Sequence, residues 1–423
     1  MDYEPLKIDP EIAKKIRISV ISQIDTQQAL TKSRQELTNK VGDIVGKIVL
    51  DMNLFLNEYE RRQLTKETVD DMIGLGPVQP CIDDPEVSDV LINGANQVLV
   101  ERRGKLELTT YKFRDEEHLF NLAQRIASMV GRRIDEASPM VDARLPDGSR
   151  VNVVIPPLAL NGVCISIRKF SDSITSLEEY VRLGSLSPEM SEFLKLAAKT
   201  RLNTIVSGGT GAGKTTLLNA MGQHIPSDQR IVTIEDAAEL RLRQPFVVSL
   251  ETRPASLEGK GEVTSRDLLR NALRMRPDRI MLGEVRGHEA FDMLQAMNTG
   301  HDGSLSTVHA NSPSDAMLRL ENMLIVSGAN MSSSLIRRQL ASALDLLVQL
   351  ERDVTGHRRV LDISEVLPDG NSDVKCQPIF RYVRDRGGEG HFEKTGYIPT
   401  FTKKMLAAGT YEQFMKILEE SPS

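Results

Sequence analysis

Apolar residues recur at helical spacing through residues 11–72, and no proline interrupts the chain between Pro10 and Pro77. Positions three or four residues apart lie on one face of an α-helix, so this spacing predicts helices that bury an apolar stripe. We therefore expect a helical N-terminal module over residues 1–72.

The pattern changes after residue 72, where glycine and proline punctuate the stretch "GLGPVQPCIDDPEVSD". The later runs "RVNVVI" and "VCISIRKF" are typical of strands, and the pairs Asp147-Gly148 and Asn161-Gly162 are typical of tight turns between strands. We expect a mixed α/β domain over residues 73–170, followed by a linker over residues 171–183.

Short β-rich runs then alternate with helical stretches through residues 184–423. The runs are "NTIVSGG", "RIVTIED", "FVVSLETR", "DRIMLGE", "GSLSTVHA" and "LDLLVQLER". Strands that alternate with helices favour a mostly parallel sheet with helices on both of its faces. The pattern thus predicts a second α/β domain in this part of the chain.

The composition, with 40% hydrophobic and 26% charged residues among 423, is that of an ordinary soluble protein. No run approaches the roughly 18 apolar residues of a membrane-spanning helix, and the first twenty residues contain no apolar signal sequence. We expect a cytoplasmic protein with only peripheral membrane contact. The net charge of -6 argues against a protein that coats nucleic acid, so no direct nucleic-acid partner is expected.

The stretch "SGGTGAGKTT" is the strongest chemical signal, because it completes the pattern Gly-x-x-x-x-Gly-Lys-Thr directly after a predicted strand. Its glycines let the backbone wrap phosphate oxygens. We expect Lys214 to contact the β and γ phosphates of ATP, and Thr215 to ligate Mg²⁺. The residues expected to bind the nucleotide are Gly208, Gly209, Thr210, Gly211, Ala212, Gly213, Lys214, Thr215 and Thr216.

Two acidic segments also follow predicted strands. The segment "RPDRIMLGEVRG" carries Glu284, and "IVTIEDAAEL" carries Glu235 and Asp236. Parallel strands place their carboxyl ends at one edge of a sheet, so both segments are expected to converge on the phosphates. We expect Glu284 to activate the attacking water and Glu235 to support the Mg²⁺ shell, partly through water, although the sequence leaves the two roles interchangeable.

The segment "NTGHDGSLSTVHANS" places His301 and His309 on either side of a predicted strand. Their spacing of eight is not typical of zinc ligands. A neutral imidazole can hydrogen-bond a γ phosphate, but a lone histidine is more often a surface or structural residue. The residues alone favour neither a phosphate sensor nor a structural role.

In this order, "GGTGAGKTT", "TIEDAAEL", "IMLGEVRG" and "TGHDGSLSTVHAN" resemble the Walker A motif, Asp box, Walker B motif and His box of the secretion ATPases. These are hexameric motors of type II and type IV secretion, type IV pili and archaeal flagella. The segments "GLGPVQP", "DPEVSDVLINGANQVLVERRGKLELT" and "DARLPDGSRVNVVIPPLALNGVCISIRKF", with the helical module, resemble the CpaF/TadA branch, which powers tight-adherence (Flp) pili.

The resemblance implies an α/β protomer with a PAS-like domain over residues 73–170 and a RecA-like P-loop ATPase domain with a C-terminal extension over residues 184–423. It also implies that the protomers form a homo-oligomeric ring, a hexamer in this family. The ring would hydrolyse ATP to ADP with Mg²⁺ as cofactor and move inner-membrane platform proteins of the pilus.

The same resemblance gives candidate catalytic roles to His301 and His309 of the His box and to four arginines. Arg144, Arg150 and Arg168 are candidates to approach a nucleotide held by a neighbouring domain or subunit. Arg286 is a candidate to act within the site or at the seam between subunits. A guanidinium group suits phosphate oxygens and stabilises transition-state charge. The alternative for each arginine is a surface charge or a structural salt bridge.

Two other functions fit the same motifs. One is a type IV secretion (VirB-like) export ATPase, and the other is a nucleotide-regulated scaffold in which ATP binding assembles the ring and little turnover occurs. A small-molecule kinase is disfavoured, because the His box and the long N-terminal domains have no use in such an enzyme.

Overall fold

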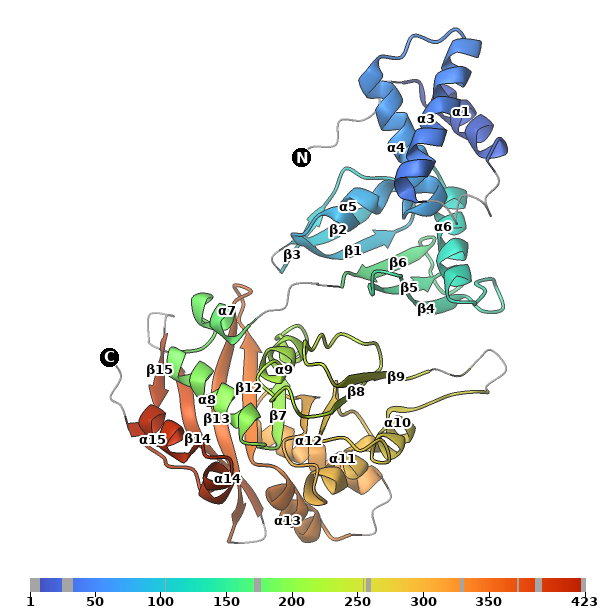
Figure 1. Cartoon of the computed structure of the whole chain (residues 1–423). Coiled ribbons are helices and arrows are strands. Elements are labelled where there is room, and N and C mark those ends of the chain that lie inside the picture. The colour runs from blue at the N-terminus through green and yellow to red at the C-terminus, as the bar shows by residue number, and fades with distance from the viewer. Residues whose placement is uncertain are drawn as a thin grey trace. The chain divides into compact units, whose positions relative to one another are not determined.

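The computed structural model describes residues 8–24, 33–102, 104–170, 176–253, 255, 260–327, 331–370, 373–384 and 390–419. The chain divides into two compact units, Met1–Ser171 (unit 1) and Asp172–Ser423 (unit 2), which Figure 1 shows. No helix among the described residues is both long enough and apolar enough to cross a bilayer.

Unit 1 begins with three helices, α1 (Pro10–Ser22), α3 (Arg34–Asp51) and α4 (Glu58–Ile73). They share one apolar cluster, in which Val41, Val45 and Leu64 are fully buried. Capping boxes fix the starts of α3 and α4, because Ser33 and Asn57 each bond the backbone N–H three residues on while a glutamate side chain bonds back. These helices are the module that the apolar spacing predicts.

The rest of unit 1 is an antiparallel sheet with the strand order β3-β2-β1-β6-β5-β4. Its strands are β1 (Val87–Asn93), β2 (Val98–Arg102), β3 (Lys105–Leu108), β4 (Met140–Arg144), β5 (Arg150–Val154) and β6 (Cys164–Arg168). The remaining elements are the 3-10 helix η1 (Gly76–Val78) and the helices α5 (Gln79–Asp83) and α6 (Glu116–Met129). Leu119 and Ile126 of α6 pack in one core with Val90 and Ile165 of the sheet. The mixed α/β fold expected here is confirmed.

Unit 2 is built on a nine-stranded sheet with the order β15-β14-β13-β12-β7-β11-β10-β8-β9. Its strands are β7 (Thr204–Gly208), β8 (Ile231–Glu235), β9 (Val247–Glu251), β10 (Arg279–Leu282), β11 (Leu305–His309), β12 (Leu346–Arg352), β13 (Arg358–Asp369), β14 (Asp373–Arg384) and β15 (Gly390–Lys394). Strands β7 to β12 are the six predicted β-rich runs, and they pair in parallel, whereas β13 to β15 extend the sheet by antiparallel pairs.

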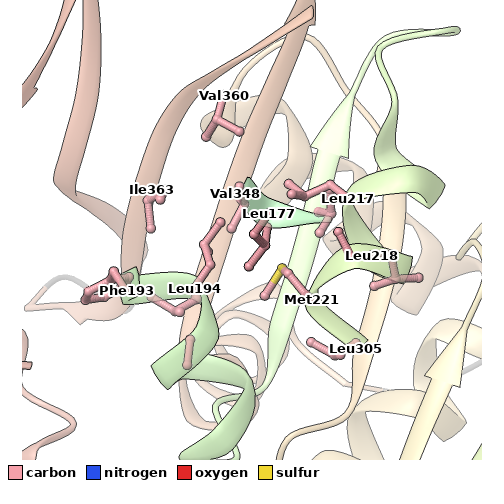
Figure 2. Packing of buried hydrophobic residues seen from close by; sticks show 14 of the residues in the cluster. Leu177, Phe193, Leu194, Leu217, Leu218, Met221, Leu305, Val348, Val360 and Ile363 are labelled. Atoms are coloured by element: carbon pink, nitrogen blue, oxygen red, sulfur yellow. The ribbon is translucent and has the colours of Figure 1, made fainter. Parts of the chain in front are cut away.

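Helices cover both faces of this sheet. They are α7 (Leu177–Arg182), α8 (Pro188–Lys199), α9 (Lys214–Gly222), α10 (Ser265–Ala272), α11 (Glu289–Asn298), α12 (Pro313–Val326), α13 (Ser333–Ala343), α14 (Thr402–Ala407) and α15 (Tyr411–Glu419). Successive strand residues point to opposite faces, so Ile205 joins the apolar cluster with α10 to α13, and Val206 joins the cluster with α7, α8, α9, α14 and α15. Figure 2 shows the cluster that contains Val206, to which Phe193, Leu217 and Val348 also belong.

Helix α7 falls within residues 171–183, for which the sequence predicts a linker. Residues 171–175 lie outside the described residues, whereas Leu177 and Tyr180 of α7 are buried in the core of unit 2. The hydroxyl of Ser176 accepts a hydrogen bond from the N–H of Glu179 and so fixes the start of this short helix. Burial of its apolar face therefore makes α7 part of unit 2.

A network of buried polar side chains aligns the starts of the parallel strands. Asn203 accepts hydrogen bonds from the N–H groups of Gly303 (2.7 Å) and Ser304 (3.1 Å), and its amide donates to the Ala343 carbonyl at 2.7 Å. These contacts join the residues that precede β7 and β11 to the end of α13.

Arg279, the first residue of β10, has no exposed surface. Its guanidinium donates to the carbonyls of Gly303 at 2.9 Å and Ala198 at 2.7 Å. Burial, and then the nearby Arg201 cation, lowers the pKa of Arg279 to about 9. A Cβ built on Gly303 would lie 1.8 Å from the Arg279 Nη1, so only glycine leaves this guanidinium in place.

We predict that Gly303→Ala lowers the free energy of unfolding by about 2–4 kcal/mol, measured by urea unfolding. A left-handed backbone strains alanine by about 1–2 kcal/mol, and the displaced Arg279 loses buried hydrogen bonds worth about as much again. Gly300→Ala is the matched control, because Gly300 also has a positive φ of 101° but nothing within 4 Å of its Cβ position. If both variants lost the same free energy of unfolding, Arg279 would not depend on the absence of a side chain at Gly303.

Candidate functional site

The parallel pairing brings the predicted motifs to one edge of the sheet in unit 2. His309, at the end of β11, pairs in register with Gly208, at the end of β7. Strand β10 lies between β11 and β8, so Glu284, two residues after β10, and Glu235, at the end of β8, reach the same edge. These residues therefore reach one edge of the sheet, as expected, and their convergence on phosphates stays a prediction.

The phosphate loop connects β7 to α9 through two glycines with left-handed backbone. Gly211 has a φ of 71° and Gly213 a φ of 94°, which residues with a side chain adopt only with strain. Helix α9 begins at Lys214, directly after Gly213. The first N–H groups of a helix have no partner within the helix, so this loop presents N–H groups and the positive end of the helix dipole to an anion.

Lys214 connects the phosphate loop to the other motifs. Its ammonium donates to the Gly209 carbonyl at 3.0 Å and lies 3.3 Å from Nδ1 of His309. The Nε2 of His309 lies 3.2 Å from a carboxylate oxygen of Glu284. The ammonium also lies 3.4 Å from Nε2, so it faces both ring nitrogens, and a neutral imidazole can accept from it at its unprotonated nitrogen. Lys214 and Glu284 thus both contact the ring of His309.

The electrostatics of this cluster keep the imidazole uncharged at neutral pH. Burial, and then the cation of Lys214, lowers the pKa of His309 below its usual value of 6.5. A protonated ring would place a second cation beside the lysine and could not accept its hydrogen bond. The neutral form is therefore the one that this geometry stabilises.

Glu284 is held in position by its chain neighbours and by Arg286. The Gly283 carbonyl accepts from the Thr307 hydroxyl at 2.7 Å, and the Val285 N–H donates to the Thr307 carbonyl at 2.8 Å. A second carboxylate oxygen of Glu284 lies 2.7 Å from the Arg286 guanidinium, which also contacts Asp236 at 3.2 Å. Arg286 therefore joins the two acidic segments within this chain.

Glu235 has a different environment, although it reaches the same edge. Its side chain is buried, and it accepts hydrogen bonds from the N–H groups of Glu239 (2.8 Å) and Leu240 (3.1 Å). A Cβ built on Gly283 would lie 2.9 Å from its Cγ, so it packs directly against the Walker B segment. Glu235 therefore holds the backbone of the loop after β8. Glu284, by contrast, contacts His309, which in turn contacts Lys214.

His301 does not join this cluster within one chain. It precedes β11, whose first residue, Leu305, pairs with Thr204 at the start of β7. His301 therefore lies toward the opposite edge of the sheet from His309, and its N–H bonds the Ala296 carbonyl there at 3.2 Å. The spacing of eight residues spans the whole strand, which separates the two histidines.

The three arginines expected to approach a nucleotide lie in unit 1 on three neighbouring strands. Arg144 of β4 pairs in register with Arg150 of β5, and Arg150 pairs with Arg168 of β6. Residues directly opposite each other on adjacent strands project from the same face of a sheet. The structure thus brings these arginines into one row, and their contact with a nucleotide stays a prediction.

Two side chains that the motifs do not include contact the phosphate loop. The Tyr180 hydroxyl of α7 donates to the Gly213 carbonyl at 3.3 Å, and Nε of Arg358, the first residue of β13, donates to the Gly211 carbonyl at 3.0 Å. Both residues are far from the loop in sequence and bond backbone atoms. No local pattern could have identified them.

Comparisons with known proteins agree with this geometry. A family model described as "Type II/IV secretion system protein" matches residues 71–389. A Mycobacterium tuberculosis protein named as a conjugal transfer protein is 40% identical over 323 residues, which are 75% of this chain and 90% of the relative. The type IV secretion system protein VirB11 of Brucella suis is 36% identical over 328 residues, with 70% of this chain and 90% of the relative covered.

A solved structure shows the same fold. The pilus retraction motor PilT with bound ADP has a TM-score of 0.51 to this chain at 19% identity, and the match covers 82% of this chain and 89% of that one. The family model spans the phosphate loop, both acidic segments and His309 within residues 71–389. Because it covers the greater part of the chain, this protein belongs to the type II/IV secretion system family of ATPases.

Proposed function

We propose that this chain is the ATP-hydrolysing motor of a tight-adherence (Flp) pilus. It would act as a hexameric ring in the cytoplasm, peripheral to the inner membrane, and move platform proteins of that membrane. The observation that carries the ATPase chemistry is the chain of contacts from Lys214 through His309 to Glu284 beside the phosphate loop. The pilus assignment is supported by the segments within residues 73–170 that resemble the CpaF/TadA branch.

In this proposal the phosphates of ATP lie against the N–H groups at the start of α9. Lys214 exchanges its contacts with Gly209 and His309 for the β and γ phosphates, as its position in the motif requires. Thr215 and Glu284 offer the hard oxygen donors that Mg²⁺ prefers, and Mg²⁺ would neutralise phosphate charge there. Glu235 would support this shell only through water, because its oxygens already accept backbone N–H groups.

Glu284 is proposed to orient and deprotonate the attacking water, and Glu235 to hold the loop after β8. We predict that Glu284→Gln lowers kcat for ATP hydrolysis by about a hundredfold or more, since an amide cannot accept the proton, while ATP affinity changes little. Glu235→Gln is the matched variant and is expected to lower kcat by less than about tenfold. Steady-state turnover and nucleotide titration measure both effects, and the reverse order would exchange the two roles.

His309 is proposed to report the γ phosphate to Glu284, because it contacts the lysine that binds this phosphate. We predict that His309→Ala lowers turnover by about tenfold or more and reduces the preference for ATP over ADP. The lowered pKa of His309 in the nucleotide-free chain implies that the wild-type kcat/KM persists below pH 6.5 and falls only in more acidic buffer, as the ring protonates. The variant should lack this acidic limb of the pH profile.

His301→Ala is the control for the histidine, since His301 lies toward the opposite edge of the sheet. It is expected to leave turnover and the ATP preference within about twofold of the wild type. A loss as large as that of His309→Ala, in a normally folded protein, would instead place His301 in a site shared between subunits.

The arginine row of unit 1 is proposed to complete a site in a neighbouring domain or subunit. Arg144, Arg150 and Arg168 concentrate three guanidinium groups on one face of a sheet, which suits the charge of a polyphosphate. Exchange of subunits between rings of Lys214→Ala and rings without these arginines is the measurement that separates a shared site from action within one chain.

A type IV secretion export motor is the second candidate, and the names of the relatives favour it. The chain is 40% identical to a protein named for conjugal transfer and 36% identical to a VirB11 protein. Both candidates require the same ATPase activity. They differ only in what the motor moves, a pilus or an exported substrate.

We predict that a strain carrying the Glu284→Gln allele loses surface pili, counted by electron microscopy, because the motor cannot turn over. Conjugative transfer and protein export should remain at the level of the wild type. A strain carrying Arg381→Met, an exposed change on β14, is the control for expression. Retained pili with lost export would overturn the pilus assignment in favour of the second candidate.

A further inference from the structure

The phosphate loop is held from two sides by elements outside its motif. Arg358, at the start of β13, bonds the carbonyl of Gly211, and Tyr180, in α7, bonds the carbonyl of Gly213. A Cβ built on Gly213 would lie 3.5 Å from Cδ of Arg358 and 3.6 Å from the Tyr180 hydroxyl. The two side chains therefore pack against the loop at its two glycines with left-handed backbone.

These two hydrogen bonds help to determine where the N–H groups of the loop point. The C=O and N–H of one trans peptide group point in opposite directions, so a bond to the carbonyl fixes the N–H as well. The Gly213 carbonyl shares its peptide group with the N–H of Lys214, the first residue of α9. The Gly211 carbonyl shares its peptide group with the N–H of Ala212, which closes a turn onto the Gly209 carbonyl at 3.3 Å.

The backbone of Arg358 is fixed by its hairpin although its side chain is exposed, whereas Tyr180 is buried. Arg358 pairs in register with Arg352 at the end of the β12–β13 hairpin. In the turn of this hairpin, the Asp353 carboxylate accepts from the N–H groups of Thr355 (2.9 Å) and His357 (3.0 Å). The Tyr180 ring is 5% exposed within the core, and burial raises the pKa of its hydroxyl, so the group remains a hydrogen-bond donor.

We propose that Arg358 is a positioning residue of the ATP site, with Tyr180 as a second and weaker one, and that both hold the phosphate loop in the shape that receives phosphate. The Gly213 carbonyl also accepts from the N–H of Leu217 at 2.9 Å, so the helix partly fixes this peptide without Tyr180. The bond of Arg358 carries charge and is expected to matter more. Neither side chain needs to touch the reacting atoms.

The test compares Arg358→Met, Arg358→Lys and Tyr180→Phe in the full chain. Isothermal titration gives the Kd of Mg·ADP and of Mg·tripolyphosphate, which lacks the nucleoside. Arg358→Met should weaken both ligands by the same factor, about tenfold, and Tyr180→Phe by about threefold, in line with charged and neutral hydrogen bonds. Arg358→Lys should recover most of the loss, since an ammonium can donate to the same carbonyl.

Turnover and unfolding separate positioning from a merely structural role. We expect Arg358→Met to raise KM while kcat changes less than about twofold, because saturating ATP restores the loop shape. The thermal midpoint of the nucleotide-free protein should match that of Arg381→Met, a change of an exposed arginine on β14 that lies 3.8 Å from Glu393.

Three results would overturn the proposal. The first is wild-type affinity for both ligands in Arg358→Met. The second is weaker ADP binding with unchanged tripolyphosphate binding, which would indicate contact with the nucleoside. The third is a lower thermal midpoint with unchanged affinity, which would indicate a structural role alone. None of these outcomes depends on whether the motor drives a pilus or an export system.

Discussion

The parallel register of β7, β11, β10 and β8 is the constraint on which the site depends. These strands are only four or five residues long, so a register fixed at one edge determines what stands at the other. Asn203 and Arg279 fix the starting edge with buried hydrogen bonds to the carbonyls and N–H groups that precede the strands. At the other edge, His309 consequently stands beside Gly208, and a shift of one residue would turn its side chain to the opposite face of the sheet.

This arrangement couples the arrival of a phosphate to the carboxylate that is proposed to activate water. Lys214 has a finite number of donors, and it uses them on the Gly209 carbonyl and on His309. A polyphosphate competes for the same ammonium with a far stronger charge, and it also favours protonation of a nearby imidazole. Both effects change the contact between His309 and Glu284. In the proposed mechanism, the cluster would therefore distinguish an occupied γ-phosphate position from an empty one through these contacts alone.

The sequence predicts the part of this site that local patterns encode. A complete phosphate-loop motif after a strand, and acidic residues after apolar runs, predict Lys214 and Glu284 as site residues, and the structure places both at one edge of the sheet. The pattern did not separate His301 from His309, because only the strand between them shows that they lie at opposite edges. Tyr180 and Arg358 were not predicted, since they recognise backbone carbonyls across long sequence separations. Helix α7 was assigned to a linker because its burial depends on tertiary packing rather than on spacing.

The arginine row in unit 1 differs from these sites, because it places like charges on neighbouring strands. Guanidinium groups directly opposite one another repel, and such like-charged pairs on adjacent strands weaken a sheet by some tenths of a kcal/mol each. Arg144 and Arg150 form one such pair and Arg150 and Arg168 the next, so the register places three like charges side by side. The repulsion disappears when an anion lies over the three groups. An anion bound over the row would therefore be favourable, which fits the proposed role of these arginines in completing a phosphate site, although that role stays a prediction.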